Sequence, residues 1–284
     1  MSVPVKQRYA EARATLEPEF GVREARSLSR LIFEDGFGIT FPERSNHIFP
    51  APLEPKLRNV VQRVLANEPV QYVLERTIFF DLPLTVRPGV LIPRQETEEL
   101  VDWMLANERH RERASVLDIG TGSGCIALAL KSKRPNWRVE GCDVSSEAIA
   151  IARENMQQNG LPLVLALVNI LHRHEWRQYN PFDLLVSNPP YIPPTERHLM
   201  SASTLEHEPR EALFVEGDDA LLYYKTIATF AKTYLREGGA LYFECNEYNA
   251  ADLRVWLGSD GWQTELKRDL NQKDRMLRCV RAPQ

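Results

Sequence analysis

The sequence predicts an α/β protein in which a doubly wound, mostly parallel sheet follows a small helical domain. Two observations carry this prediction. Residues up to about 75 show helical periodicity, for example at Val60, Val61, Val64 and Leu65, whose neighbours are polar. From about Glu96 onward, helix-like and strand-like segments alternate, which is typical of parallel strands joined by helices. Ligands of such sheets bind at the carboxyl ends of the strands.

Turn residues divide the chain into three predicted parts. A helical domain spans residues 1–75 and is interrupted by a proline-rich connection at residues 49–52. A β-hairpin at residues 76–92 joins it to the α/β domain of residues 93–284, with strands at 77–80 and 84–86 on either side of Asp81-Leu82-Pro83. Further strands are predicted at 115–117, 137–142, 163–168, 182–186, 262–266 and 276–280.

Composition is that of an enzyme-sized globular protein. The 284 residues are 43% hydrophobic, and no apolar run reaches the roughly 18 residues of a membrane span. The N-terminus lacks the apolar stretch of a signal peptide, so a cytoplasmic protein without membrane contact is expected. The four cysteines form no closely spaced pair and are predicted to be reduced core thiols: Cys125, Cys142, Cys245 and Cys279.

Charge distribution bears on the partner. Residues 1–75 hold 10 basic and 10 acidic residues, and the remainder holds 25 and 29. The basic residues form no arm or stripe along the sequence. Proteins that bind nucleic acid through its phosphates normally have one. A protein substrate is therefore favoured over DNA or RNA as the direct substrate, and a monomer is expected.

A glycine-rich turn follows the apolar residues 115–117 and precedes a helix that starts at Cys125. Glycine lets the backbone turn sharply and approach a ligand closely. Cys125 stands where a third dinucleotide-binding glycine would be needed, and no lysine-containing phosphate loop is present, so a ligand without a pyrophosphate is predicted. The turn comprises Asp118, Ile119, Gly120, Thr121, Gly122, Ser123 and Gly124.

Two polar residues follow the next two strands. Asp143 stands 23 residues after Gly120, where a carboxylate can accept hydrogen bonds from ribose hydroxyls. Its alternative role is as the cap of the following helix, although Ser145 and Ser146 can supply that cap. Asn169 follows the third strand, where its carbonyl could accept from the amino group of an adenine or simply be a polar loop residue.

The segment Asn188-Pro189-Pro190-Tyr191 follows the apolar strand at residues 182–186. A planar amide or aryl amine nitrogen attacks a methyl sulfonium poorly unless its N–H groups meet acceptors. Asn188 offers a side-chain acceptor, and Pro189 offers a carbonyl without a competing N–H beside it. Tyr191 could lie flat on the planar group. These residues indicate methyl transfer to such a nitrogen, with no base of unusual pKa required.

In this order and spacing, the glycine turn, Asp143 and residues 188–191 resemble class I S-adenosylmethionine amino-methyltransferases. Residues 91–100 (LIPRQETEEL), 68–72 (EPVQY) and 207–210 (HEPR) narrow the resemblance to the HemK/PrmC family, which methylates the glutamine of the Gly-Gly-Gln motif of peptide chain release factors. The resemblance implies a Rossmann-like, seven-stranded sheet and S-adenosylmethionine as cofactor. It also implies cofactor contacts from Asp118, Gly120, Thr121, Gly122, Ser123, Gly124, Asp143, Asn169, Ile170 and Asn188, and catalysis by Asn188, Pro189, Pro190 and Tyr191.

Three departures from the family pattern stand out. Asn169 replaces an aspartate, Gln95 replaces a proline, and residues 245–248 (CNEY) replace a glycine-containing turn. Arg94 and Glu96 have two interpretations: an ion pair at the start of a helix, or a border of the cofactor's methionine end and the substrate channel.

Other functions remain open alongside release factor methylation. A ribosomal-protein glutamine methyltransferase, and an adenine or guanine amino-methyltransferase for DNA or RNA, would share these motifs. A module that binds a nucleoside without catalysis belongs to another class. No metal is expected, because His172 and His174 are interpreted as a solvated turn rather than as ligands.

Overall fold

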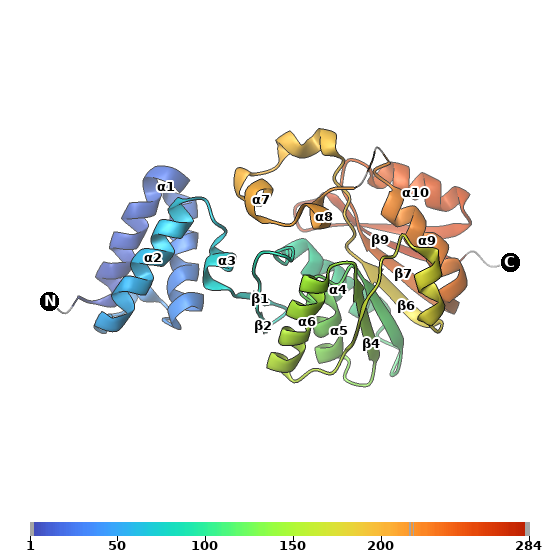
Figure 1. The fold of residues 1–284 in the computed structure, drawn as a ribbon, viewed down its shortest axis with the longest axis horizontal. Coiled ribbons are helices and arrows are strands. Elements are labelled where there is room, and N and C mark those ends of the chain that lie inside the picture. The colour runs from blue at the N-terminus through green and yellow to red at the C-terminus, as the bar shows by residue number, and fades with distance from the viewer. Residues whose placement is uncertain (1–2, 216, 218, 282–284) are drawn as a thin grey trace. The chain divides into compact units, whose positions relative to one another are not determined.

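The computed structural model describes residues 3–215, 217 and 219–281, and these residues form two compact units (Figure 1). The first contains the chain up to Thr77 together with residues 86–88 and 201–207. The second contains residues 78–85, 89–200 and 208 onward. The predicted domains 1–75 and 93–284 also include residues 1, 2, 216, 218 and 282–284, which lie outside the described residues.

The first unit is helical, as predicted. It consists of α1 (Val5–Phe37), α2 (Glu54–Leu65), α3 (Val70–Leu74), α7 (Ala202–His207) and two short 3-10 turns, Pro42–Arg44 and Ala51–Leu53. Gly21 has non-helical backbone angles, with φ 74° and ψ 163°, and so divides α1 into two helical segments. The buried faces of α1, α2 and α3 form one core, in which Phe33 packs edge-on against Tyr9. The unit thus has its own hydrophobic core.

The second unit contains the predicted mostly parallel, seven-stranded sheet. Its strand order is β5-β4-β3-β6-β7-β9-β8. The first five strands in that order are parallel, and β9 runs antiparallel to both of its neighbours. The bounds are β3 (Ser115–Ile119), β4 (Arg138–Asp143), β5 (Val164–Leu167), β6 (Phe182–Ser187), β7 (Leu235–Glu244), β8 (Trp262–Arg268) and β9 (Asp274–Arg281).

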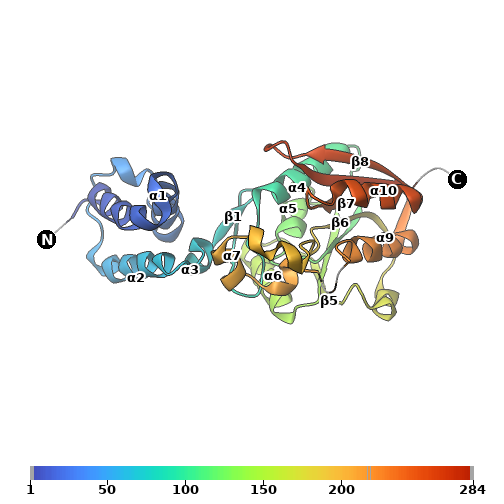
Figure 2. The same cartoon turned by 90° about the horizontal axis from the view of Figure 1, so that it is seen from above.

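Helices cover both faces of the sheet (Figure 2). On one face, α4 (Gln95–Asn107) and α5 (Cys125–Lys133) bury alternate strand residues such as Val116 and Leu184. On the other face, α9 (Leu222–Tyr234) and α10 (Ala250–Ser259) bury the strand residues that alternate with these, such as Leu117 and Leu185. The remaining elements are α6 (Ser146–Asn159), α8 (Arg210–Leu213) and the 3-10 segments Arg173–Gln178 and Pro194–Leu199. Within the described residues, every helix is too short or too polar to cross a membrane.

The predicted hairpin exists, but its second strand begins two residues earlier than expected. β1 spans Thr77–Phe79 and β2 spans Leu82–Leu84. Phe80 and Asp81 have φ of 53° and 66°, so these two residues alone make the turn, in the left-handed conformation of a tight hairpin. Pro83 therefore lies in the strand rather than in the turn, which an edge strand tolerates.

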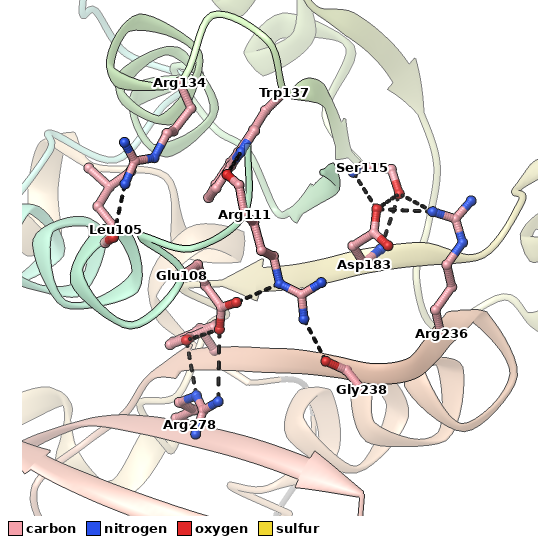
Figure 3. Close-up of polar contacts among 11 residues, drawn as sticks. Leu105, Glu108, Arg111, Ser115, Arg134, Trp137, Asp183, Arg236, Gly238 and Arg278 are labelled. Atoms are coloured by element: carbon pink, nitrogen blue, oxygen red, sulfur yellow. Dashed lines mark hydrogen bonds and ion pairs between the residues drawn. The ribbon is translucent and has the colours of Figure 1, made fainter. Parts of the chain in front are cut away.

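Polar contacts join neighbouring elements near the amino ends of the strands (Figure 3). The Asp183 carboxylate in β6 accepts from the backbone N–H and the hydroxyl of Ser115 in β3, both at 2.7 Å, and from Arg236 in β7 at 2.9 Å. Buried Glu108 accepts from the Tyr242 hydroxyl at 2.7 Å and from Arg111 at 2.7 Å. These contacts fix β3, β6 and β7 side by side, at the end opposite to the predicted site.

Gly239 lies at a bulge where β7 packs closely on β6. The pairing register shifts from Phe182 opposite Leu235 to Leu184 opposite Ala240, which leaves a bulge in β7. A Cβ on Gly239 would lie 2.7 Å from the Asp183 carbonyl oxygen and 2.8 Å from that of Arg236. Gly239→Ala should therefore lower the free energy of unfolding by about 1–3 kcal/mol in chemical denaturation.

Gly258→Ala is the matched control for this substitution. Gly258 lies in α10, and nothing would meet its Cβ within 4 Å. This change should leave the free energy of unfolding unchanged or raise it by up to about 1 kcal/mol, because alanine favours a helix. Equal effects of the two substitutions would contradict the account of the bulge.

Candidate active site

The carboxyl ends of β3, β4, β5 and β6 border a cavity of about 480 Å³ in the second unit. Ile119 at the end of β3 lies opposite Cys142 in β4 and Ser187 in β6, so the loops that follow these strands meet at one edge. The predicted site residues that line the cavity are Gly120, Thr121, Gly122, Ser123, Asp143, Asn169, Ile170, Asn188, Pro189 and Pro190.

Three predicted site residues do not line the cavity. Asp118 is fully buried behind the glycine turn, where it accepts from the Thr121 hydroxyl at 2.7 Å. Its Oδ1 has no hydrogen-bond partner among the described residues, and burial raises its pKa to about 7. Gly124 caps α5 with φ 82° and packs on Ala152. Tyr191 packs on the core beneath α9 and α10, so the expectation that its ring covers a substrate stays a prediction.

Backbone hydrogen bonds hold the glycine turn at the end of β4. The N–H groups of Gly120 and Thr121 donate to the Cys142 carbonyl at 2.8 and 2.9 Å. The N–H of Gly122 donates to Oδ2 of Asp143 at 2.8 Å. Gly120 and Gly122 have φ of 75° and 54°, a region that side chains disfavour. The turn thus presents backbone rather than side chains to the cavity.

The two readings of Asp143 can be separated. Ser145 caps α6, because its hydroxyl oxygen accepts from the N–H of Ala148 at 3.2 Å. Asp143 instead accepts from the N–H of Ser145 at 2.9 Å and from that of Gly122. Burial raises the pKa of Asp143, and these backbone donors oppose the rise. Asp143 is therefore a cavity carboxyl rather than the helix cap.

Asn169 lies at the cavity wall in a turn of its own. Its Oδ1 accepts from the N–H of Leu171 at 2.9 Å, and its own N–H donates to Glu175 at 2.8 Å. Glu175 also forms, with His172 and His174, the one group of metal-compatible ligand atoms in the described part of the chain. Both histidines are exposed, and Glu175 is already bonded to His172 at 3.0 Å.

A partly buried chain of hydrogen bonds holds Asn188. Its Nδ2 donates to Oγ1 of Thr97 at 3.3 Å, and the Thr97 hydroxyl donates to Oε2 of Glu244 at 2.6 Å. The Tyr191 hydroxyl donates to Oε1 of the same carboxyl group at 3.4 Å. Because the amide nitrogen of Asn188 is bonded to Thr97, its carbonyl oxygen is left available as an acceptor.

Sequence reasoning missed Thr97 and Glu244. Thr97 is buried in the first turn of α4 and lines the cavity, and Glu244 is buried at the end of β7. Burial raises the pKa of Glu244 to about 7, an effect that the Thr97 hydroxyl partly opposes. The sequence contains one signal for Glu244: this carboxylate directly follows the apolar run 240–243, so it must find a buried partner.

Arg94 pairs with Glu208 rather than with Glu96, so of the two interpretations of Arg94 and Glu96 the ion pair between them does not hold. Glu208 is buried and also accepts from the N–H of Ile92 at 3.1 Å. Pro93 and Pro209, the neighbours of this pair, line the cavity. Arg94 and Glu208 thus join the two segments of the wall to which Pro93 and Pro209 belong.

The remaining departures are accommodated locally. Gln95 is the first residue of α4. Asn246 makes the turn after β7, because its Oδ1 accepts from the N–H of Tyr248 at 3.1 Å. Cys142, Cys245 and Cys279 are buried free thiols and Cys125 is a half-buried one, and both Cys125 and Cys142 line the cavity.

Comparison with solved structures shows the fold. The catalytic domain of hMettl16 in complex with a 3′UTR hairpin matches 85% of this chain and 86% of its own, with a TM-score of 0.55 and 17% identity. A T. thermophilus 16S rRNA N2 methyltransferase in complex with AdoMet and guanosine matches 73% of this chain and 50% of its own, with a TM-score of 0.50 and 17% identity. The fold is that of class I methyltransferases.

Comparison of sequences shows the family. Residues 95–229 match the family model described as methyltransferase small domain. The release factor glutamine methyltransferase of Bacteroides thetaiotaomicron is 36% identical over 276 residues, 96% of this chain and 98% of that protein. That of Flavobacterium psychrophilum is 40% identical over 223 residues, 77% and 78% of the two chains. The chain belongs to the release factor glutamine methyltransferase family.

Proposed function

We propose that this protein transfers a methyl group from S-adenosylmethionine to the side-chain amide nitrogen of the glutamine in the Gly-Gly-Gln motif of peptide chain release factors. The observation that carries the proposal is the placement of Asn188 at the cavity wall, with its amide nitrogen bonded to Thr97. Similarity to named release factor glutamine methyltransferases over nearly the whole chain supports the choice of substrate.

The cavity suits the cofactor. Its glycine turn offers backbone without side chains, and Asp143 offers carboxylate oxygens that ribose hydroxyls can reach. The apolar wall, which includes Val90, Ile126 and Val168, suits an adenine ring. Asp118, fully buried directly behind the turn, supports it by accepting from the Thr121 hydroxyl. Bound S-adenosylmethionine supplies a methyl group on a positively charged sulfur, which leaves as a neutral thioether.

The protein's own part is to make the amide nitrogen nucleophilic. Oδ1 of Asn188 and the carbonyl of Pro189 accept the N–H bonds of the substrate amide, so that its lone pair is less delocalised as the N–C bond forms. Each such acceptor contributes roughly 1.5–3 kcal/mol when its partner gains charge. The nitrogen then loses one proton to solvent. A neutral leaving group requires no metal, and we infer a monomeric enzyme that acts in the cytoplasm, where translation ends.

Asn188→Ala should separate catalysis from cofactor binding. Loss of one charge-assisted acceptor should lower kcat at least about tenfold, while the Kd of S-adenosylhomocysteine changes little. Initial rates and isothermal titration calorimetry check this. Asn107→Ala, at the end of α4 and absent from the cavity wall, is the control and should keep wild-type turnover. Wild-type kcat in Asn188→Ala would rule out the assigned role.

Asp143→Ala should impair cofactor binding more than turnover. It should weaken binding of S-adenosylhomocysteine about tenfold or more, because ribose acceptors are lost, with a smaller effect on kcat at saturating cofactor. In thermal melting, S-adenosylhomocysteine should raise the Tm of the wild type and a nicotinamide dinucleotide should not. A rise in Tm with the dinucleotide alone would contradict the reading of the glycine spacing.

The helical unit is proposed to recognise the release factor away from the reacting glutamine. It has its own core, and residues Phe79 and Leu84 of the hairpin belong to the core of the second unit. A chain that begins at residue 76 should therefore bind S-adenosylhomocysteine normally, yet methylate the intact release factor at least about tenfold less efficiently, because remote binding energy is lost.

Mass spectrometry identifies the acceptor. Intact release factor incubated with the wild-type enzyme should gain the mass of one methylene on the Gly-Gly-Gln glutamine, and a factor with alanine in place of that glutamine should gain none. Label on nucleic acid, or on a ribosomal protein with the release factor untouched, would overturn the substrate. Cofactor binding without any methyl transfer would instead support a binding module.

A further inference from the structure

We propose that Glu244 is a positioning residue of the methyl transfer reaction, which acts through Thr97 to hold the Asn188 amide with its carbonyl oxygen toward the substrate. This inference rests on the proposed function of the same site. Glu244 lies at the end of β7, 147 residues from Thr97, and Thr97 is 91 residues from Asn188. Three segments distant in the chain thus form one hydrogen-bonded line that ends at the cavity.

The direction of this line follows from donor and acceptor chemistry. An ionised carboxylate can only accept hydrogen bonds. At 2.6 Å from Glu244, the single hydroxyl proton of Thr97 is therefore committed to the carboxylate. Oγ1 of Thr97 is then left with lone pairs alone toward Asn188, 3.3 Å away, and must face the NH₂ group.

The opposite orientation of Asn188 would defeat catalysis. If the amide were rotated by half a turn, its carbonyl oxygen would face the lone pairs of Thr97, and its NH₂ group would face the substrate nitrogen. The NH₂ group of Asn188 and the N–H group of the substrate amide, both donors, would then face each other where an acceptor is needed. An asparagine alone does not choose between these orientations, because its oxygen and nitrogen are nearly the same size. The buried carboxylate makes the choice.

Glu244 acts on the site from behind the cavity wall, through side chains that it holds. It is 2% exposed and is absent from the residues that line the cavity, so it does not touch the reacting atoms. Its second oxygen accepts from Tyr191 at 3.4 Å, which also ties down the segment that follows Asn188. The backbone carbonyl of Glu244 accepts from the Tyr224 hydroxyl of α9 at 3.1 Å, which fixes the end of β7.

The ionisation of Glu244 gives the orientation a pH dependence. Burial raises its pKa to about 7, and the negative charge of Glu96 on α4 contributes to the rise. Arg275 on β9 and the hydroxyls of Thr97 and Tyr191 lower it, and the thiols of Cys125 and Cys245 also face it. As pH falls through this pKa the carboxyl gains a proton, becomes a donor to Thr97 and releases the Thr97 hydroxyl. The value of kcat should therefore rise with pH through this range.

Glu244→Gln tests the proposal in the full-length enzyme, because glutamine keeps the shape and removes the obligatory acceptor. We expect kcat on release factor to fall about tenfold or more, with the Kd of S-adenosylhomocysteine within about twofold of the wild type. The rise of kcat around neutral pH should disappear. Thr97→Val should have the same effect, Thr97→Ser should keep more activity than Thr97→Val, and the double variant should be no worse than either single one.

Glu108→Gln is the matched control. Glu108 is an equally buried carboxyl that accepts from a tyrosine hydroxyl, and it lies in the other polar cluster of the unit (Figure 3). This variant should keep the kcat and the pH profile of the wild type. If Glu244→Gln also keeps both, or if it loses S-adenosylhomocysteine binding in proportion to kcat, Glu244 is not a positioning residue. If Glu244→Gln does not fold, Thr97→Val and the wild-type pH profile decide.

The side-chain amide of Asn188 gives a readout that is independent of activity. In NMR spectra of the wild type with S-adenosylhomocysteine, its Nδ2 protons, assigned by their loss in Asn188→Ala, should exchange slowly with water. In Glu244→Gln and Thr97→Val, exchange should be at least about tenfold faster, because the bond to Thr97 is weakened or lost. Unchanged exchange would overturn the proposal. Failure of the wild type to methylate any release factor would overturn the proposed function and leave this readout intact.

Discussion

Parallel pairing of β3 with β4 and β6 is the constraint on which the site depends. It places Ile119, Cys142 and Ser187 side by side, so that the three segments that follow them begin at one edge. Each segment then needs only local interactions to present its groups. The glycine turn binds back to β4, Ser145 caps α6, and Asn188 reaches Thr97. The strength of the sheet core, rather than the loops themselves, thus sets the geometry of the cavity.

The second unit contains two kinds of carboxyl group, which lie in different places and have different partners. Glu108 and Asp183, at the far end of the sheet, are paired with arginines and serve to join elements (Figure 3). Glu244 and Asp118, close to the cavity, accept mainly from hydroxyl and backbone groups, and burial raises the pKa of each to about 7. Carboxyl groups without a strong ion pair are costly to the fold. Because both groups lie beside the cavity, we infer that they serve the function of the site although they destabilise the fold.

Much of the fold and part of the site could be predicted, because they depend on local patterns. Six strands of the seven-stranded sheet and the glycine turn were predicted within a few residues of their observed bounds, whereas no range was predicted for β7. The hairpin was misplaced because Phe80 and Asp81 adopt a left-handed turn without the glycine that usually marks one. Thr97 and the Arg94 to Glu208 pair were missed, because hydrogen bonds between segments distant in the chain leave no spacing to recognise.

The thiol of Cys125 faces the cavity in which a methyl sulfonium would be held. A thiolate there would compete with the substrate for the methyl group and would alkylate the enzyme itself. Burial, assisted by the negative charge of Asp118, raises the pKa of this thiol to about 12. The surroundings of Cys125 thus favour the neutral thiol, the weaker nucleophile, beside the place of methyl transfer.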